Sequence, residues 1–201
     1  MLYKNPKLHT KISSLSNSGG SIFIMRHTQA KTNILLKISA KIRGFPLTKR
    51  GIWQAKKIAQ GLKSKNIDFI ISSSIQRCRE TAQIISKIIN KPVFFDDRLK
   101  EINPGIFESK SIIRYAMYFR SQKERFYKRP KSGESREDVK KRIAEFYKEI
   151  IERYPNKNIF IISHGDPLRL LQGVILRLSD EDIIKRKDEL TLKIGEVRRL
   201  V

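Results

Sequence analysis

The 201-residue chain contains a single cysteine and lacks any apolar run of membrane-spanning length. One cysteine, Cys78, excludes an intramolecular disulfide and any metal site built from several cysteines. A spanning helix needs roughly 18–20 mostly apolar residues, so we expect no membrane association. The first twenty residues also lack the apolar middle of a signal peptide. We therefore expect a cytoplasmic protein.

Two phosphate-binding loops are missing as well. Neither GxxxxGK[ST] nor GxGxxG occurs, which removes the support for nucleotide binding by those routes. Acidic residues are scarce, with 20 Asp and Glu against 43 Lys and Arg and a formal net charge of +23. Such a charge favours nucleic acid, an acidic membrane surface or a phosphorylated small molecule as partner. Because the basic residues are spread along the whole chain, surface solvation or a bias of the source organism explains them better than a nucleic-acid footprint.

Short apolar runs alternate with helical patterns along the chain. Unbroken runs at 22–25, 69–71 and 159–163 predict strands that are covered on both faces, and 92–95 predicts a shorter strand. Strands that alternate with helices indicate a three-layer α/β sandwich with a mostly parallel sheet and helices on both faces. We expect one catalytic domain over residues 21–201, preceded by a loosely held lead-in over residues 1–20.

Helix signals fill the gaps between these strands. Thr48 is expected to cap a helix whose apolar stripe runs from Ile52 to Leu62, and the serines at 72–74 to cap the next one. Ser135 is expected to cap a third helix, and Asp166 with Pro167 to begin a fourth. The tail at 190–201 alternates, so we expect it to form an edge hairpin.

Residues 109–131 differ in character, because aromatic and basic side chains interleave there. This composition would suit a nucleic-acid grip by stacking and phosphate contacts. A helical flap over a pocket for an anionic substrate uses the same residue types. We favour the flap, because the segment is inserted between elements of one sheet.

Polar side chains follow the strands at their carboxyl ends. Arg26 and His27 come directly after the first strand, and His164 follows the last of the buried runs. Ligands bind at this edge of open α/β sheets. Arg77 lies in the first turn of the helix after the second strand, where free N–H groups favour an anion. The sequence therefore predicts a cluster of imidazole and guanidinium groups at one edge of the sheet.

Six motifs in order resemble the histidine phosphatase superfamily, also called the phosphoglycerate mutase-like family, from about residue 22 to about residue 178. They are Arg-His-Thr-Gln-Ala-Lys-Thr-Asn at 26–33, Pro-Leu-Thr-x-x-Gly-x-x-Gln-Ala at 46–55, Ser-x-x-x-Arg-x-x-x-Thr-Ala at 73–82, Leu-Lys-Glu-Ile-Asn-Pro-Gly at 99–105, Gly-Glu-Ser at 133–135 and Ser-His-Gly at 163–165. Each motif alone is weak evidence. Six in the right order are strong evidence.

The resemblance implies three catalytic residues. His27 would be the nucleophile that forms a phosphohistidine, which water later cleaves. Glu101 would protonate the leaving oxygen and then activate water, which requires a carboxyl with a raised pKa. His164 would donate a further hydrogen bond to the phosphoryl oxygens.

The resemblance also implies a phosphate-binding set. Arg26 and Arg77 would bind the phosphoryl oxygens through their planar guanidinium groups. Asn33 would contact the phosphoryl group or the loop that holds it, and Thr28 would line or shape the pocket. Because phosphoryl transfer depends mostly on positioning and electrostatic stabilisation, such a pocket needs no metal and no cofactor.

Departures from the family pattern bear on the activity. Thr28 replaces the usual glycine, and Ala30 replaces a hydroxyl residue that helps the mutases bind substrate. The Ile-Asn-Pro-Gly after Glu101 resembles the phosphatase branch, and the stretch up to Gly133 is short beside the mutase insertion. We therefore expect a metal-independent phosphomonoesterase of the histidine acid type, acting on a phosphorylated small molecule.

Two alternatives stay open. One is a cofactor-dependent phosphoglycerate mutase. The other is a non-catalytic relative that binds a phospho-ligand or nucleic acid, although a retained proton donor argues against it and nucleic acid is the less favoured partner. No motif identifies the ester or an oligomeric state.

Overall fold

A five-stranded sheet forms the centre of the protein, in a computed structural model that describes residues 19–201. The strand order is β3-β2-β4-β1-β5. The strands are β1 (Ile22–Arg26), β2 (Phe69–Ser72), β3 (Val93–Phe95), β4 (Ile159–Ser163) and β5 (Val197–Arg199). The first four run parallel, and β5 pairs antiparallel with β1. Most of the expected lead-in lies outside the described residues.

Successive side chains of the central strands enter two different cores. In β1, Ile22 and Ile24 join one hydrophobic cluster, whereas Phe23 and Met25 join the other. Because side chains alternate across a strand, an unbroken apolar run is what a sheet covered on both faces requires. The prediction of doubly covered strands is confirmed.

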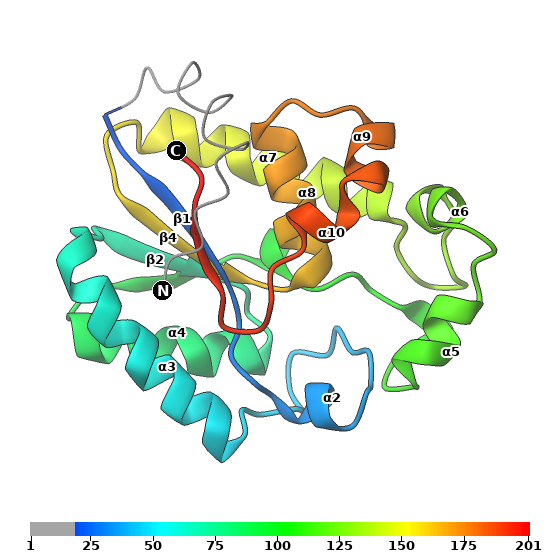
Figure 1. Cartoon of the computed structure of the whole chain (residues 1–201), viewed down its shortest axis with the longest axis horizontal. Coiled ribbons are helices and arrows are strands. Elements are labelled where there is room, and N and C mark those ends of the chain that lie inside the picture. The colour runs from blue at the N-terminus through cyan, green and yellow to red at the C-terminus, as the bar shows by residue number, and fades with distance from the viewer. Residues whose placement is uncertain (1–18) are drawn as a thin grey trace.

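Four long helices supply the two covering layers (Figure 1). They are α3 (Lys49–Leu62) and α4 (Gln76–Ile89) on one face, and α7 (Arg136–Arg153) and α8 (Gly165–Ile175) on the other. The predicted three-layer sandwich is therefore confirmed. Short elements complete the described chain: α2 (Lys31–Ile34), η1 (Lys63–Lys65), η2 (Asp97–Leu99), η3 (Gly105–Phe107), α5 (Ile112–Met117), α6 (Gln122–Tyr127), α9 (Asp180–Lys185) and α10 (Lys187–Leu190).

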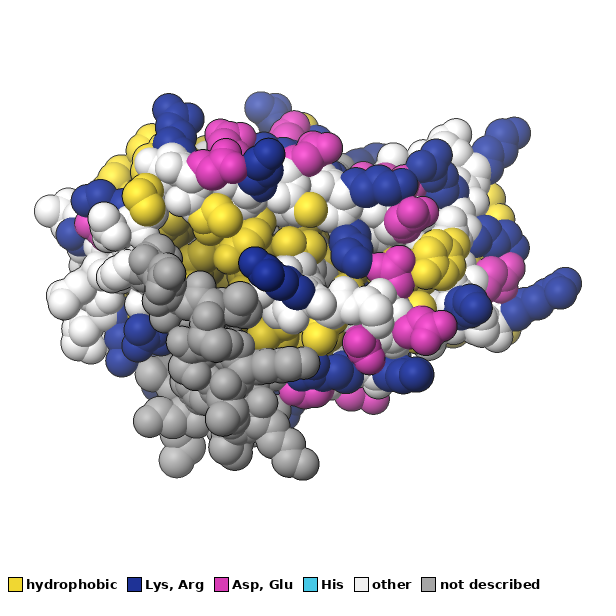
Figure 2. Space-filling model, turned by 90° about the horizontal axis from the view of Figure 1, so that it is seen from above, with side chains coloured by type: hydrophobic (Ala, Val, Ile, Leu, Met, Phe, Trp, Pro, Cys, Tyr) yellow, Lys and Arg dark blue, Asp and Glu magenta, His cyan; other side chains and the backbone are white. Residues whose placement is uncertain are grey.

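Positive charge is dispersed over the face of the protein that Figure 2 shows. On the face shown in Figure 2, Lys and Arg side chains are scattered over the surface, with Asp and Glu among them. Within the described residues, no helix combines the length and the apolar character that crossing a membrane requires.

Two predicted helix caps are confirmed and two are wrong. Thr48 and Ser135 accept hydrogen bonds from the backbones of their helices. The serines at 72–74 do not cap α4, whose N-cap is Ile75. Ser73 instead forms a hydrogen bond with His164, and Ser74 donates one to Asp97. These hydroxyls therefore connect the start of α4 to other parts of the chain.

The fourth helix begins earlier than predicted. Its N-cap is His164 and its first residue is Gly165, because β4 runs directly into the helix without a loop. Asp166 and Pro167 therefore lie within the first turn.

Two further expectations about packing are wrong. Ile52 does not belong to the buried stripe of α3, because the residue is 39% exposed and Gly51 and Ala55 occupy that face. The tail forms no hairpin: β5 adds a single edge strand to β1, and Leu200 donates from its N–H to Ile22 O at 2.8 Å. The alternation in the tail reflects this pairing.

Candidate active site

Parallel pairing of β1 with β4 brings the two histidines together. Arg26 lies opposite Ser163 in the register, and the N–H of His27 donates to Ser163 O at 3.0 Å. His27 and His164 therefore leave the sheet side by side, with ring centroids 5.3 Å apart. The sequence prediction that these imidazoles meet is confirmed.

The hydrogen bonds of His27 fix its tautomer. Its Nδ1 lies 2.8 Å from the carbonyl oxygen of Thr28, which can only accept, so Nδ1 carries the proton. Its Nε2 accepts from Arg77 Nε at 3.1 Å, and a guanidinium can only donate. The lone pair of the imidazole is consequently on Nε2, the nitrogen beside Arg77.

Both site histidines are held in the neutral form. Burial lowers the pKa of His27 well below its usual range, and the positive charges of Arg77 and Arg26 lower it further. Burial likewise lowers the pKa of His164, again with help from Arg77. A neutral imidazole, which keeps a lone pair on one ring nitrogen, is the form that can attack an electrophile.

These depressed pKa values predict a loss of stability in mild acid. Below the unfolded-state pKa of about 6.5, His27 and His164 are protonated in the unfolded chain but stay neutral in the folded protein. Each histidine then lowers the free energy of unfolding by up to about 1.4 kcal/mol per pH unit as the pH falls. Burial raises the pKa of Glu101, which acts in the opposite direction, so a variant is needed to isolate the histidines.

The measurement is urea unfolding of wild type and His27→Gln between about pH 7 and about pH 5.5. We expect the slope of stability against pH to be shallower in His27→Gln by up to about 1.4 kcal/mol per pH unit. Equal slopes in the two proteins would contradict a neutral, buried His27.

Two arginines offer donors to the same space. Arg77 is 3% exposed, and its Nη2 donates to Ser39 O at 3.1 Å. Arg26 donates from Nη1 to Leu192 O at 3.2 Å. Within residues 19–201, the buried Nη1 of Arg77 and Nε of Arg26 have no hydrogen-bond partner. Both arginines line a cavity of about 240 Å³ with His27, so these donors suit an oxyanion there.

His164 lies behind this cavity. Its Nε2 is 2.9 Å from Ser73 Oγ and 3.3 Å from Cys78 Sγ, and its ring is fully buried. Cys78 is fully buried, and this burial raises the pKa of its thiol. Ser73 orients the His164 ring, a role that the sequence did not reveal.

The loop after His27 is clamped by α3. Thr48 N–H donates to Gln29 O at 3.0 Å, and Gln54 Oε1 accepts from Gln29 N–H at 3.0 Å. A Cβ at Gly51 would lie 2.0 Å from Gln29 O, so only glycine allows this approach. The motif at 46–55 thus positions the loop that follows His27.

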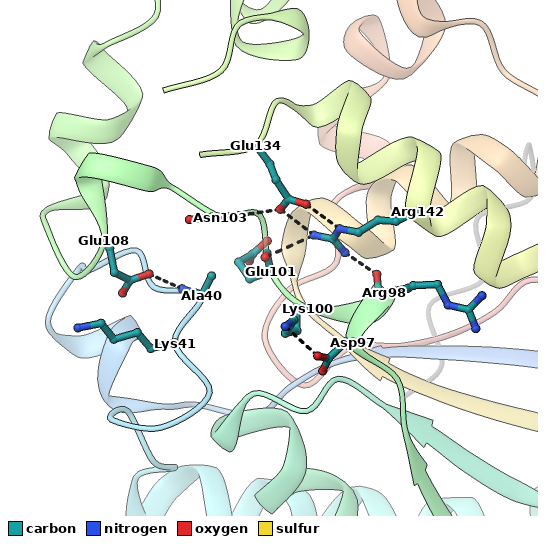
Figure 3. Close-up of a pocket in the computed structure, with 10 residues that line it drawn as sticks. All are labelled: Ala40, Lys41, Asp97, Arg98, Lys100, Glu101, Asn103, Glu108, Glu134 and Arg142. Carbon is teal, nitrogen blue, oxygen red and sulfur yellow. Dashed lines mark hydrogen bonds and ion pairs between the residues drawn. The ribbon is translucent and has the colours of Figure 1, made fainter. Parts of the chain in front are cut away.

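Glu101 stands at the boundary of two cavities. It lines the cavity that contains His27, and it also lines an adjoining one of about 590 Å³ (Figure 3). Burial raises the pKa of its carboxyl, Asp166 raises it further, and Arg77 opposes the rise. The raised pKa favours the protonated carboxyl, which is the form that a general acid requires.

An arginine on α7 holds the Glu101 loop in place (Figure 3). Arg142 donates from Nη2 to Glu101 O at 3.4 Å and from Nη1 to Arg98 O. Its Nε pairs with Glu134 Oε1 at 3.0 Å, and Glu134 also accepts from Asn103 N–H at 2.8 Å. The Gly-Glu-Ser motif thereby links α7 to the proposed proton donor.

Asn33 and Thr28 support the pocket in different ways. Asn33 lines the cavity, while its Oδ1 accepts from Ala30 N–H at 2.8 Å, so it holds the loop. Thr28 is fully buried, and its hydroxyl lies 3.2 Å from Thr81 Oγ1, behind the cavity. Its φ is not positive, so replacing glycine causes no backbone strain. Of the two expected roles for Thr28, shaping the pocket is the one that this placement supports.

The cavity offers donors for an anion. Its polar lining is dominated by guanidinium and ammonium groups, which bind oxyanions. Among residues 19–201, no group of three or more His, Cys, Asp or Glu side chains is arranged to hold a metal ion.

Most of the chain matches a known protein family. Residues 22–191 match the histidine phosphatase superfamily (branch 1). The chain belongs to this superfamily. The motifs at 26–33, 73–82 and 163–165 all lie within the matched residues. The resemblance inferred from them is therefore confirmed.

Individual relatives agree with this assignment. The probable phosphoglycerate mutase GpmB of Photorhabdus laumondii is 29% identical over 167 residues, which are 78% of this chain and 75% of that protein. A mycobacterial glucosyl-3-phosphoglycerate phosphatase, solved with VO3, has a TM-score of 0.78 at 20% identity and covers 90% of both chains. A putative alpha-ribazole-5'-P phosphatase of Escherichia coli has a TM-score of 0.74 at 21% identity, over 90% of this chain and 89% of that one. These two structures share the fold.

Two further arginines line the cavity that contains His27, and neither is among the predicted site residues. They are Arg136 and Arg169, which are 3% and 5% exposed. A signal for Arg136 exists in the sequence: it stands three residues before Val139 and seven before Ile143, so it shares the buried stripe of α7. An arginine at the head of an apolar stripe is a candidate for a buried functional group.

Proposed function

We propose that this protein is a phosphomonoesterase that hydrolyses a small anionic phosphate ester through a phosphohistidine on His27. Membership of the histidine phosphatase superfamily supports a phosphoryl-transfer enzyme of the phosphatase or mutase kind. The expected cytoplasmic location and the metal-independent chemistry are parts of the same proposal.

The observation that carries the proposal is the fixed tautomer of His27. The Nε2 lone pair stands beside Arg77 at the cavity that both residues line. Nε2 attacks phosphorus as the bond from phosphorus to the ester oxygen breaks, while Arg26 and Arg77 neutralise the phosphoryl oxygens. The ring then gains positive charge, which the Thr28 carbonyl stabilises through Nδ1–H.

Glu101 serves both halves of the reaction. In the first half, its proton passes to the leaving oxygen, which departs as the alcohol. In the second half, the Glu101 carboxylate takes a proton from water as that water attacks phosphorus, and the bond to His27 Nε2 breaks. The cycle releases phosphate and returns Glu101 to the protonated form.

The Glu101→Gln variant tests this assignment. An alkyl phosphate needs a proton on its leaving oxygen, whereas p-nitrophenyl phosphate has a good leaving group. General acid catalysis contributes about 10²–10⁴-fold, so we expect formation of the phosphoenzyme from an alkyl ester to slow by at least about a hundredfold. The p-nitrophenyl ester should lose much less in the same single-turnover step. An equal loss for both esters would contradict a proton donor at position 101.

A phosphoglycerate mutase is the second candidate, favoured by the names of relatives such as the probable mutase of Photorhabdus laumondii. The two are separated by supplying 3-phosphoglycerate with a trace of bisphosphoglycerate. A phosphatase releases inorganic phosphate, whereas a mutase forms the isomer and releases little phosphate. The short stretch between Glu101 and Gly133 leads us to expect phosphate.

A further inference from the structure

The active-site cavity carries more positive charge than one phosphoryl group requires. Seven cationic side chains and two carboxylates line it. The cations are Arg26, Lys37, Arg77, Arg125, Arg136, Arg169 and Lys187, and the carboxylates are Glu101 and Asp166. With Arg26 and Arg77 assigned to the reacting phosphoryl group, five cations remain beside one ionised carboxylate.

Four of the remaining groups cluster on one side of the cavity, with buried Arg136 and Arg169 at its centre. Arg136 lies with Nε 3.3 Å from Asp166 Oδ1, and Arg169 forms an ion pair with the same oxygen. Arg125 reaches the cavity from α6, over the ring of Tyr115 at 5.0 Å. We call Arg125, Arg136, Asp166 and Arg169 the Arg136 cluster.

The charges of the Arg136 cluster are not balanced. Burial alone would raise the pKa of Asp166, but Arg136, Arg169 and Arg125 outweigh it and hold that pKa well below the usual range. One carboxylate thus faces three guanidinium groups. Burial lowers the pKa of Arg136 only to about 10, so Arg136 remains charged at neutral pH.

Unused donors point to what the cluster binds. Within residues 19–201, the buried Nε of Arg125 has no hydrogen-bond partner, and Arg136 Nε has only its ion pair with Asp166 at 3.3 Å. A buried donor that stays unpaired costs free energy, and more so when it is charged. An oxyanion in the cavity would satisfy these donors and balance the excess charge.

We propose that the Arg136 cluster binds a second anionic group, a carboxylate or a phosphate, on the same ester whose phosphoryl group reacts at His27. This inference rests on the proposed function for the identity of the reacting group. The cavity of about 240 Å³ is smaller than the range of about 300–1,000 Å³ typical of drug-sized ligands. The substrate class is therefore a small phosphomonoester with two anionic ends.

Matched pairs of esters test the inference. Glycerol 3-phosphate differs from 3-phosphoglycerate by one carboxylate, and fructose 6-phosphate differs from fructose 1,6-bisphosphate by one phosphate. Affinity is measured by calorimetry on the His27→Ala protein, so that no ester is consumed. In at least one pair, we expect the ester with two anionic groups to bind about tenfold tighter or more than the ester with one. The pair that discriminates identifies the second group as carboxylate or phosphate.

Substitutions assign that preference to the cluster. Arg125→Gln leaves the pairing of Asp166 with Arg136 and Arg169 in place, and we expect it to reduce the affinity ratio by about tenfold. Arg153→Gln is the matched control, because it removes the same charge from an exposed position on α7 and should keep the ratio. Ratios near one in both pairs, or an equal effect of Arg125→Gln and Arg153→Gln, would overturn the inference.

Phosphate release from the same esters by wild type is measured separately. If wild type releases no phosphate from any of them or from p-nitrophenyl phosphate, the proposed hydrolysis fails, while the affinity ratios still decide the second anion site.

Discussion

His27→Ala is expected to lower kcat for p-nitrophenyl phosphate by at least about a thousandfold, since losing a nucleophile that acts within a catalytic unit has effects of this size or larger. The variant removes Nε2, whose lone pair is fixed toward Arg77 by the Thr28 carbonyl on the opposite side of the ring. The measurement is the steady-state release of p-nitrophenol.

Chemical rescue separates loss of the nucleophile from loss of structure. Removing the buried ring opens a space beside Arg77, and added imidazole is expected to restore part of the activity there. Urea unfolding of the variant checks that the domain is folded. A His27→Ala protein that keeps full activity would exclude His27 as the nucleophile.

Asp166→Asn is expected to lower the free energy of unfolding by about 3–5 kcal/mol, the cost of leaving a buried charge without its partner. Asp166 is the carboxylate that Arg136 and Arg169 share. Both arginines are nearly fully buried, so solvent cannot compensate for the loss. The measurement is urea unfolding at neutral pH.

Two companion variants make this result specific. Asp180→Asn removes a carboxylate from a partly exposed pair with Lys140, and it should cost about 1 kcal/mol or less. Adding Arg136→Met to Asp166→Asn removes one of the uncompensated charges and should recover part of the lost stability. If Asp166→Asn costs no more than Asp180→Asn, the charges of the Arg136 cluster are not coupled as described.

The sheet and its covering helices could be predicted because their sequence signals are local. In β1 and β4 the unbroken apolar runs match the burial of both faces of the strand. The histidines could be placed for the same reason, since parallel neighbours end at one edge of the sheet. The prediction of a serine cap before α4 is wrong, because the hydroxyl of Ser73 forms a hydrogen bond with His164, which lies 91 positions away in the sequence.

The second cationic cluster could not be predicted from local patterns. Arg125, Arg136 and Arg169 come from three different helices, and in a chain with 43 Lys and Arg no single arginine stands out. Their common feature is that their charges act on Asp166, an arrangement that depends on tertiary packing. Arg125 belongs to residues 109–131, the segment for which we predict a flap, and it lines the cavity. The composition of that segment does not indicate which of its cations faces the cavity.

The most direct test of the account is to find the phosphoryl group on His27. Glu101→Gln should slow attack by water, so that mixing it with labelled p-nitrophenyl phosphate and quenching in alkali, in which phosphohistidine survives, preserves the intermediate. We expect about one labelled phosphoryl group per chain, on the peptide that contains His27. Release of p-nitrophenol over many turnovers with no label on the protein, or label on a different residue, would contradict it.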